Sequence, residues 1–480
     1  CLQPPSLMNS SSSLRRVAPL LFLSGACALI YQVAWFRELR LIFGASTAAS
    51  AAVLGVFMGG LGIGGRVLGK RADRAKNPLD LYARLELGVA VAAAITPALV
   101  RVAQLVYLGV GGAATLGSAG ATLVRLVLSV VVLGPPALLM GGTLPAMARA
   151  VEQASHAGRL GAVVGTVGAN FVLIEVFGTR LTLWLACLVN VLVAVIARVM
   201  ARGAIGRDAK AASSGDEGAA PRAHAETGLP ASLRWFPPFA AGISGLAFML
   251  MELVWYRMLA PLLGGSSYTF GLILAIALFG IGIGGLAYAR TKRPATLSMF
   301  AVTCALEALA LALPYALGDK LALFALLLRP LARASFATSV LSWSVIAAIV
   351  VLPAAIISGY QFSLVIGLYG RGAKNVARDV GNAYLANTIG SIAGSIGGGF
   401  GLIPLLSAPR CWQAVAVLLL AVACLATVLD VRERRLSLGA LASVVIAVPA
   451  ALMLAATGPT HVWRHSGIGA GRADLGMDVS

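Results

Sequence analysis

The stretch SGACALIYQVAWFRELRLIFG at residues 24–44 recurs as SGLAFMLMELVWYRMLAPLLG at residues 244–264. The two stretches align without a gap, and the motif GIGG follows each of them at the same distance, at 62–65 and at 282–285. A long unit that occurs twice indicates an internally duplicated architecture. Because each unit holds several apolar segments of bilayer-spanning length, we predict a duplicated membrane protein and not a solenoid.

The composition supports the same class of protein. Of the 480 residues, 59% are hydrophobic and only 11% are charged, whereas a soluble domain carries about 25% charged residues. The net charge is +19, and we assign this excess to cytoplasmic loops rich in Lys and Arg. Since no basic stripe is interleaved with exposed aromatic residues, we expect no nucleic-acid partner.

Hydropathy predicts about 13 spans, as two groups of six and one extra helix. The predicted spans are 18–38, 46–68, 82–107, 121–147, 161–177, 180–200, then 236–259, 267–289, 296–317, 337–367, 381–405, 411–429 and 436–457. An even number of spans in each half makes the two repeats parallel in the membrane, as in the major-facilitator arrangement. The predicted fold is therefore all-α and polytopic, with two parallel six-helix repeats and one extra C-terminal helix.

These spans predict the regions of the chain and its orientation. The regions are an N-terminal tail (1–17), the first membrane repeat (18–201) and a cytoplasmic linker (202–234). The second membrane repeat (235–430), the extra helix (431–457) and a C-terminal tail (458–480) follow. The linker is rich in Gly, Ala, Ser and charge, a composition that cannot bury a core. The positive-inside rule predicts a multi-pass protein of the inner (plasma) membrane with a cytoplasmic N-terminus.

Ionisable groups at membrane depth are functional candidates by default. Glu252 lies inside an apolar helix, and its partner in the first repeat is the neutral Gln32. Glu86 and Glu307 also occupy equivalent places in the two repeats, and here both residues are acidic. A carboxylate that faces the interior of the bundle could bind a cation or carry a proton.

Two Trp-Arg pairs occupy equivalent places in the repeats. Trp35 precedes Arg37, and Trp255 precedes Arg257, near the end of a predicted span. Aromatic and basic residues there are typical interfacial anchors, and a cation–π site is the alternative. The same arginines give the carboxylates a structural alternative, as partners in an ion pair.

The sequence GKRADRAK at residues 69–76 resembles the loop signature G-x-x-x-D-R-x-G-R-K of the major-facilitator family. The resemblance implies that Asp73 caps or pairs across a loop and that Arg74 stays cytoplasmic. We therefore treat both as structural or gating candidates.

Several stretches resemble the membrane region of the fused membrane spermidine synthases: YQVAWFR at 31–37, LYARLELG at 81–88, PPALLMGGTLP at 135–145 and YLANTIG at 384–390. In that family a soluble aminopropyltransferase domain follows the last helix and transfers an aminopropyl group from decarboxylated S-adenosylmethionine to putrescine. The resemblance implies a polyamine or related cation as ligand, with Asn387 and Gln32 as polar ligands. This chain ends where the soluble domain would begin.

The repeat register changes within the fifth span. Gly161 aligns with Gly381, but Gly165 aligns with Gly394, which indicates that nine residues are missing from this span in the first half. On this alignment the span is only marginally long enough to cross, and Asn387 has no partner in the first repeat.

No nucleophile–base pair, metal cluster or cofactor loop is evident, so we expect no catalytic residues, no metal and no cofactor in this chain. The leading hypothesis is a transporter-like domain for a polyamine or another small cation in the lipid bilayer. One alternative is a remnant of a bifunctional membrane aminopropyltransferase, and another is a scaffold that docks a separate soluble synthase.

Overall fold

The computed structural model describes residues 7–43, 47–75, 77–148, 155–211, 229–263, 267–291, 294–369, 376–434 and 437–459. The described residues form helices joined by short turns, and they contain no strand. The predicted all-α class is therefore confirmed. The chain divides into two compact units, residues 1–225 and 226–480, and each is described by itself.

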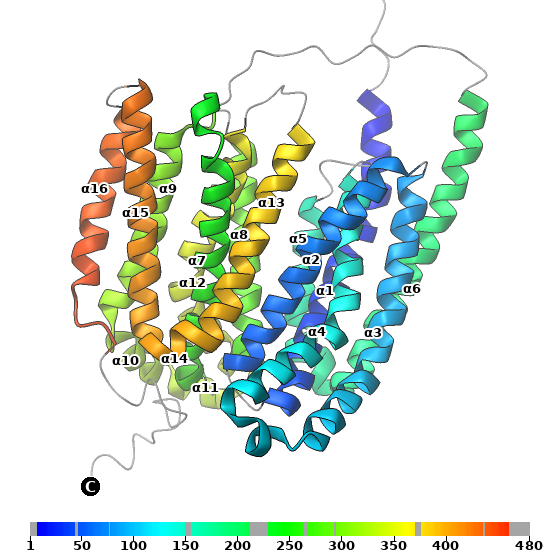
Figure 1. Cartoon of the computed structure of the whole chain (residues 1–480), viewed down its shortest axis with the longest axis horizontal. Helices are drawn as coiled ribbons and strands as arrows, with labels where there is room; N and C mark the ends of the chain where they lie inside the picture. Colours follow the sequence, from blue (N-terminus) through cyan, green and yellow to red (C-terminus); the bar gives the residue numbers. More distant parts are fainter. Residues whose placement is uncertain are drawn as a thin grey trace, which may run out of the picture. The chain divides into compact units, whose positions relative to one another are not determined.

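The described residues of the first unit form six α-helices and one π-helical segment. They are α1 (Leu7–Phe43), α2 (Thr47–Arg74), α3 (Pro78–Gly109), α4 (Gly112–Ala148), α5 (Ser155–Gly168), η2 (Ala169–Leu173) and α6 (Ile174–Ala211) (Figure 1). Because α2 continues to Arg74, most of the sequence GKRADRAK is helical, and its prediction as a loop is wrong. The side chains of Asp73 and Arg74 lie outside the described residues.

The second unit repeats this order and adds helices. They are η3 (Ala231–Leu233), α7 (Phe236–Leu263), α8 (Ser267–Arg290), α9 (Leu297–Leu317), α10 (Lys320–Leu327), α11 (Arg329–Ala334), α12 (Phe336–Gly367), α13 (Val376–Ile392), η4 (Ala393–Leu402), α14 (Ile403–Leu406), α15 (Ala408–Arg434) and α16 (Leu438–Leu454). The extra helix α16 packs on α9 and α15.

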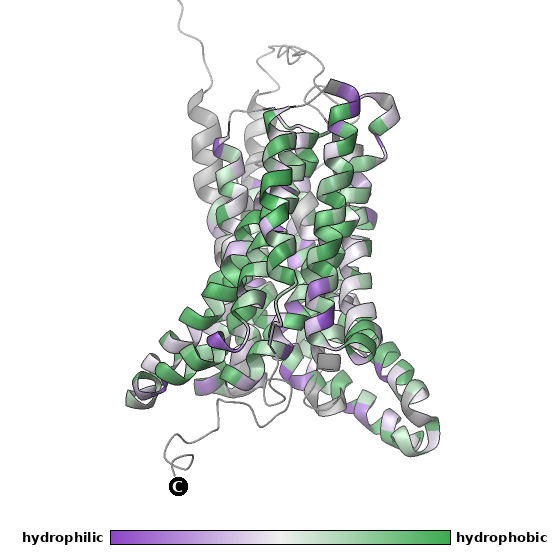
Figure 2. Ribbon diagram, turned by 90° about the vertical axis from the view of Figure 1, so that its left-hand side faces the viewer, coloured by the Kyte–Doolittle hydropathy of each residue, from purple (hydrophilic) through white to green (hydrophobic). Residues whose placement is uncertain are grey.

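Eleven helical stretches in the described parts are long and apolar enough to cross a membrane. Most of their length is hydrophobic, as the green ribbons of Figure 2 show. One stretch, Gly161–Arg202, is 42 residues long and contains both the fifth and the sixth predicted span. Gly178 interrupts it, since its φ of 72° and ψ of 171° are not helical. The helix at the thirteenth predicted span, α16, is apolar but only 17 residues long.

Each unit is held together by the same helix pairs. In the first unit α1 packs on α5, α2 on α4 and α3 on α6; in the second, α7 packs on α13, α8 on α12 and α9 on α15. Glycines make the closest approaches. A Cβ added to Gly64 would lie 1.9 Å from the carbonyl oxygen of Leu138, and one added to Gly284 would lie 1.9 Å from that of Ile356. Small residues allow such backbone contact in lipid, where it supplies the packing energy.

The α1–α5 and α7–α13 crossings correct the repeat register. A Cβ on Gly161 would lie 1.8 Å from the carbonyl oxygen of Phe22, and one on Gly390 would lie 1.8 Å from that of Gly242. Phe22 and Gly242 are equivalent in the ungapped alignment of α1 with α7. Gly161 therefore corresponds to Gly390, and its predicted alignment with Gly381 is wrong.

The missing nine residues thus precede Gly161 and do not shorten the fifth span. Helical structure runs from Ser155 to the break at Gly178. In the corrected register the place of Asn387 is taken by Gly158, so the first unit still lacks an equivalent amide.

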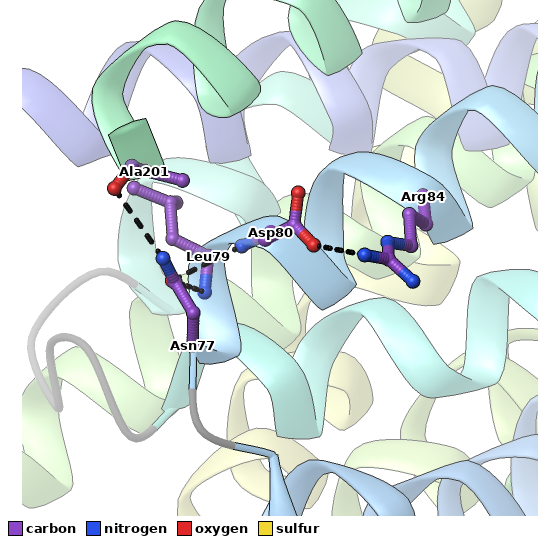
Figure 3. Close-up of polar contacts among 5 residues, drawn as sticks. All are labelled: Asn77, Leu79, Asp80, Arg84 and Ala201. Atoms are coloured by element: carbon purple, nitrogen blue, oxygen red, sulfur yellow. Dashed lines mark hydrogen bonds and ion pairs between the residues drawn. The ribbon is translucent and has the colours of Figure 1, made fainter. Parts of the chain in front are cut away.

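The start of α3 is fixed by Asn77. Its Oδ1 accepts hydrogen bonds from the backbone N–H groups of Leu79 and Asp80, both at 3.2 Å. Its Nδ2 donates to the carbonyl oxygen of Ala201 in α6 at 3.3 Å (Figure 3). The Asn77 side chain therefore caps α3 and ties it to α6. By fixing where α3 begins, it also fixes the position of Glu86, which lies about two turns further along this helix.

Candidate functional site

Glu252 is a buried carboxylate in the middle third of α7. Its side chain is 1% exposed, and it lies in the apolar run MLMELVW at residues 249–255. Its Oε1 is buried without a hydrogen-bond partner in the described part of the chain. Burying an unpaired polar atom costs free energy. The position is therefore one at which a bound cation or proton would be stabilised.

The structural alternative for Glu252 was an ion pair with Arg37 or Arg257. Within the residues that the structure describes, Glu252 has no ion-pair partner. The side chain of Arg257 is exposed, and Arg37 lies close enough to Glu175 for their charges to interact. The predicted ion pair of Glu252 with Arg257, within the second unit, is thus absent from the described structure.

Gln32 takes the place of Glu252 in the first unit. It is also 1% exposed, and its Nε2 is buried without a partner among the described residues. The equivalent positions therefore differ in chemistry. Gln32 offers an unpaired donor, whereas Glu252 offers an unpaired acceptor.

The two tryptophans lie inside the protein. Trp35 is 0% and Trp255 is 1% exposed, so the prediction of interfacial anchors is wrong. The Nε1 of Trp35 donates to Thr96 Oγ1 at 3.0 Å, and its ring stacks on Tyr31 at 5.7 Å. The Nε1 of Trp255 is buried without a partner in the described structure, and its ring packs edge to face on Phe248 at 6.0 Å.

Glu86 is fully engaged by hydrogen bonds. It lies in α3 and is 1% exposed. The hydroxyl of Ser24 in α1 donates to Oε1 at 2.6 Å, and Nδ2 of Asn190 in α6 donates to Oε2 at 2.9 Å. This carboxyl joins three helices of the first unit.

Glu307 is the equivalent of Glu86 in the second unit. It lies in α9, is 4% exposed, and lies near the hydroxyl of Ser358 in α12. Its Oε2 is buried without a partner in the described structure. Glu252 and Glu307 are therefore buried carboxyl groups of the second unit that keep an unpaired oxygen among the described residues.

Asn387 lies where α13 crosses α7. A Cβ added to Gly245 would lie 2.2 Å from the carbonyl oxygen of Asn387 and 2.9 Å from its Oδ1. Gly245 precedes Glu252 by about two helical turns. The described contacts thus place Asn387 against Gly245 and do not bring it to Glu252.

Asn190, a partner of Glu86, was not among the residues predicted from the sequence. Asn190 is 2% exposed and lies in the long apolar run LTLWLACLVNVLVAVIA at residues 181–197. A polar side chain at that depth is expected to have a polar partner, because an unsatisfied group in the bilayer is costly. Its isolation among apolar residues was the signal that could have identified it.

No protein-family model and no curated protein sequence matches the chain. Among solved structures, it is similar to a bacterial homologue of the iron transporter ferroportin in an outward-facing state, with a TM-score of 0.50 at 15% identity over 88% of this chain and 98% of that one. It is also similar to a bacterial homolog to the human lysosomal transporter Spinster, inward-facing and unoccupied (TM-score 0.47, 14% identity, 94% and 97% covered).

A further similar structure is the major facilitator superfamily proton:xylose symporter XylE bound to 6-bromo-6-deoxy-D-glucose (TM-score 0.45, 13% identity, 89% and 97% covered). At these identities the similarity concerns the fold. The chain has an all-α fold whose described part contains eleven helices long and apolar enough to cross a membrane, and it shares this fold with the bacterial ferroportin homologue.

Proposed function

We propose that this protein is a secondary transporter that moves a small organic cation across the inner membrane, with polyamines as the first class to test. The observation that carries the proposal is Glu252, a carboxyl group buried in α7 whose Oε1 has no partner among the described residues. Ionisable residues inside membrane helices mark substrate and ion pathways. A cation is the ligand that compensates a buried carboxylate best.

The polyamine class rests on sequence. The stretches at 31–37, 81–88, 135–145 and 384–390 resemble the membrane region of the fused membrane spermidine synthases. That resemblance supports a polyamine or a related amine as the cation. We also propose a cytoplasmic N-terminus, which the positive-inside rule supports.

The contacts support different roles for the candidate residues. Glu252 acts as the countercharge for the cation, and Glu307, which has a free acceptor among the described residues, assists it. Both oxygens of Glu86 already accept hydrogen bonds, which supports a structural role. Asn387 lies against Gly245, about two turns of α7 from Glu252, and is not assigned to this site.

Uptake of radiolabelled putrescine and spermidine into proteoliposomes tests the proposal. We expect uptake above protein-free liposomes, and we expect Glu252→Gln to lower it by at least about tenfold, equivalent to about 1.4 kcal/mol of lost interaction. Arg84→Ala is the control, because Arg84 is 70% exposed and, among the described residues, forms its ion pair with Asp80 one turn away. Absence of uptake for every amine tested, or full uptake by Glu252→Gln, would contradict the proposal.

A further inference from the structure

Glu252 and Trp255 share one face of α7. They are three residues apart, a spacing that brings the Cβ atoms of a helix to about 5–6 Å. Oε1 of Glu252 and Nε1 of Trp255 are both buried, and both lack a hydrogen-bond partner in the described structure. An unpaired acceptor and an unpaired donor therefore lie about one helical turn apart on the same surface.

The first unit shows that the protein can satisfy an indole in this place. Trp35, the equivalent of Trp255, donates to Thr96 of α3 at 3.0 Å. With Glu86 aligned to Glu307, the place of Thr96 is taken in α9 by Leu317, which has no side-chain acceptor. The second unit thus keeps the indole but lacks the acceptor that pairs with it.

Phe248 limits what Trp255 can contact. It lies four residues before Glu252, on the same face, and its ring packs on the Trp255 ring with an interplanar angle of 83°. This contact holds the indole ring in place, so its N–H has a fixed direction. The indole N–H of Trp255, buried and without a partner among the described residues, is the group that a ligand would have to pair.

We infer that the ligand of the α7 face carries two different groups, a cationic hydrogen-bond donor for Glu252 and a hydrogen-bond acceptor for Trp255 Nε1, as in a short amino alcohol. This inference rests on the proposed function and narrows its substrate class. A fully protonated diamine or polyamine carries donors only and leaves the indole N–H unpaired. When a ligand lacks the group that pairs with a buried polar group of the site, that polar group stays unpaired. The site therefore binds such an analogue less tightly than a ligand that carries the matching group.

Three amines with the same four-carbon chain test the inference: 4-aminobutanol, butylamine and putrescine. Their affinities for the purified wild-type protein are measured by isothermal titration calorimetry. We expect 4-aminobutanol to bind about tenfold more tightly than the other two, since one additional hydrogen bond is of that order. Trp255→Phe should remove this preference by weakening 4-aminobutanol more than butylamine, while Glu252→Gln should weaken all three amines.

Trp35→Phe is the matched control, because its indole N–H already has Thr96 as partner; it should keep the preference for 4-aminobutanol. Size-exclusion profiles and thermal unfolding show whether each variant is folded. Equal or weaker wild-type binding of 4-aminobutanol than of butylamine overturns the inference without any variant. If putrescine is transported but the wild-type protein shows no preference for the amino alcohol, the inference fails and the proposed function stands. If no amine is bound or transported, the proposed function itself fails.

Discussion

Gly178 and Ser407 adopt the same backbone conformation at equivalent turns of the two units. Their φ and ψ angles are 72° and 171° for Gly178, and 73° and 160° for Ser407. This region of backbone space is nearly confined to glycine, because a Cβ is strained there. Ser407 is the one non-glycine residue with positive φ in the described structure. The second unit therefore keeps the turn geometry of the first at the cost of local strain.

Replacing Ser407 by Gly should stabilise the protein. Strain of this kind costs about 1–3 kcal/mol, and the glycine variant relieves it. The greater conformational freedom of glycine in the unfolded chain offsets about 1 kcal/mol of this stabilisation. We expect a higher midpoint of thermal unfolding in detergent for Ser407→Gly. The converse change, Gly178→Ser, should lower the midpoint. A lower midpoint for Ser407→Gly would show that the hydroxyl makes a contact that outweighs the strain.

Gly284→Ala should disrupt the α8–α12 contact. The added Cβ would lie 1.9 Å from the carbonyl oxygen of Ile356 and 2.7 Å from the amide nitrogen of Tyr360, so the backbones must separate. Overpacking of this kind costs about 1–3 kcal/mol or more. The measurement is the yield of monodisperse protein and its unfolding midpoint.

The matched control is Gly282→Ala in the same helix, since a Cβ there meets no atom within 4 Å. This change should leave the yield and the unfolding midpoint unchanged or slightly raised, because alanine favours a helix more than glycine does. Equal behaviour of the two variants would contradict the close helix contact.

Ser24→Ala should destabilise the first unit. The variant removes the 2.6 Å hydrogen bond to Glu86, and an acceptor left unpaired in the interior costs about 1–3 kcal/mol. Ser244→Ala, the equivalent change in α7, is the control, because Ser358, and not Ser244, is the hydroxyl that lies near Glu307. We expect a lower unfolding midpoint only for Ser24→Ala. Equal shifts for the two variants would argue against the asymmetric pairing of the two glutamates.

Asn77→Ala should destabilise the start of α3. It removes a cap that serves two backbone N–H groups and the bond to Ala201 of α6, and loss of such a cap typically costs about 1–2 kcal/mol. Arg84→Ala, also shown in Figure 3, should change stability by less than about 0.5 kcal/mol, because its ion pair with Asp80 is largely exposed. Thermal unfolding of the two variants, measured side by side, tests this difference. A larger loss of stability for Arg84→Ala than for Asn77→Ala would refute it.

The main features of the fold could be predicted from residues 24–65 and 244–285 alone. Apolar runs of about 20 residues have few folded alternatives in a bilayer, because every backbone polar group must be paired within the segment. Gly64 and Gly284 of the GIGG motif lie at close helix contacts, which small residues allow in lipid. The register of the fifth helix was predicted wrongly at Gly161, because glycines recur too often there for sequence alone to choose between two alignments.

The candidate site was only partly predictable. Sequence identified the buried acids Glu86, Glu252 and Glu307, because an acidic residue within an apolar run is visible in the sequence. It placed the two tryptophans at the membrane interface, whereas both are buried. The sequence of a span gives the depth of a residue in the bilayer but not which face of the helix meets protein.

The sequence by itself determined the duplication, the helical membrane class and the identity of the buried polar groups, since these follow from composition and period along one helix. Only the tertiary structure decided which of those groups are paired. Ser24 and Asn190 satisfy Glu86 from two other helices, and Thr96 satisfies Trp35. Glu252 and Trp255 have no such neighbours in the described structure. The reason is physical: a hydrogen bond between helices depends on the residue that the partner helix places opposite, and that residue lies 60 to 100 or more positions away in the chain.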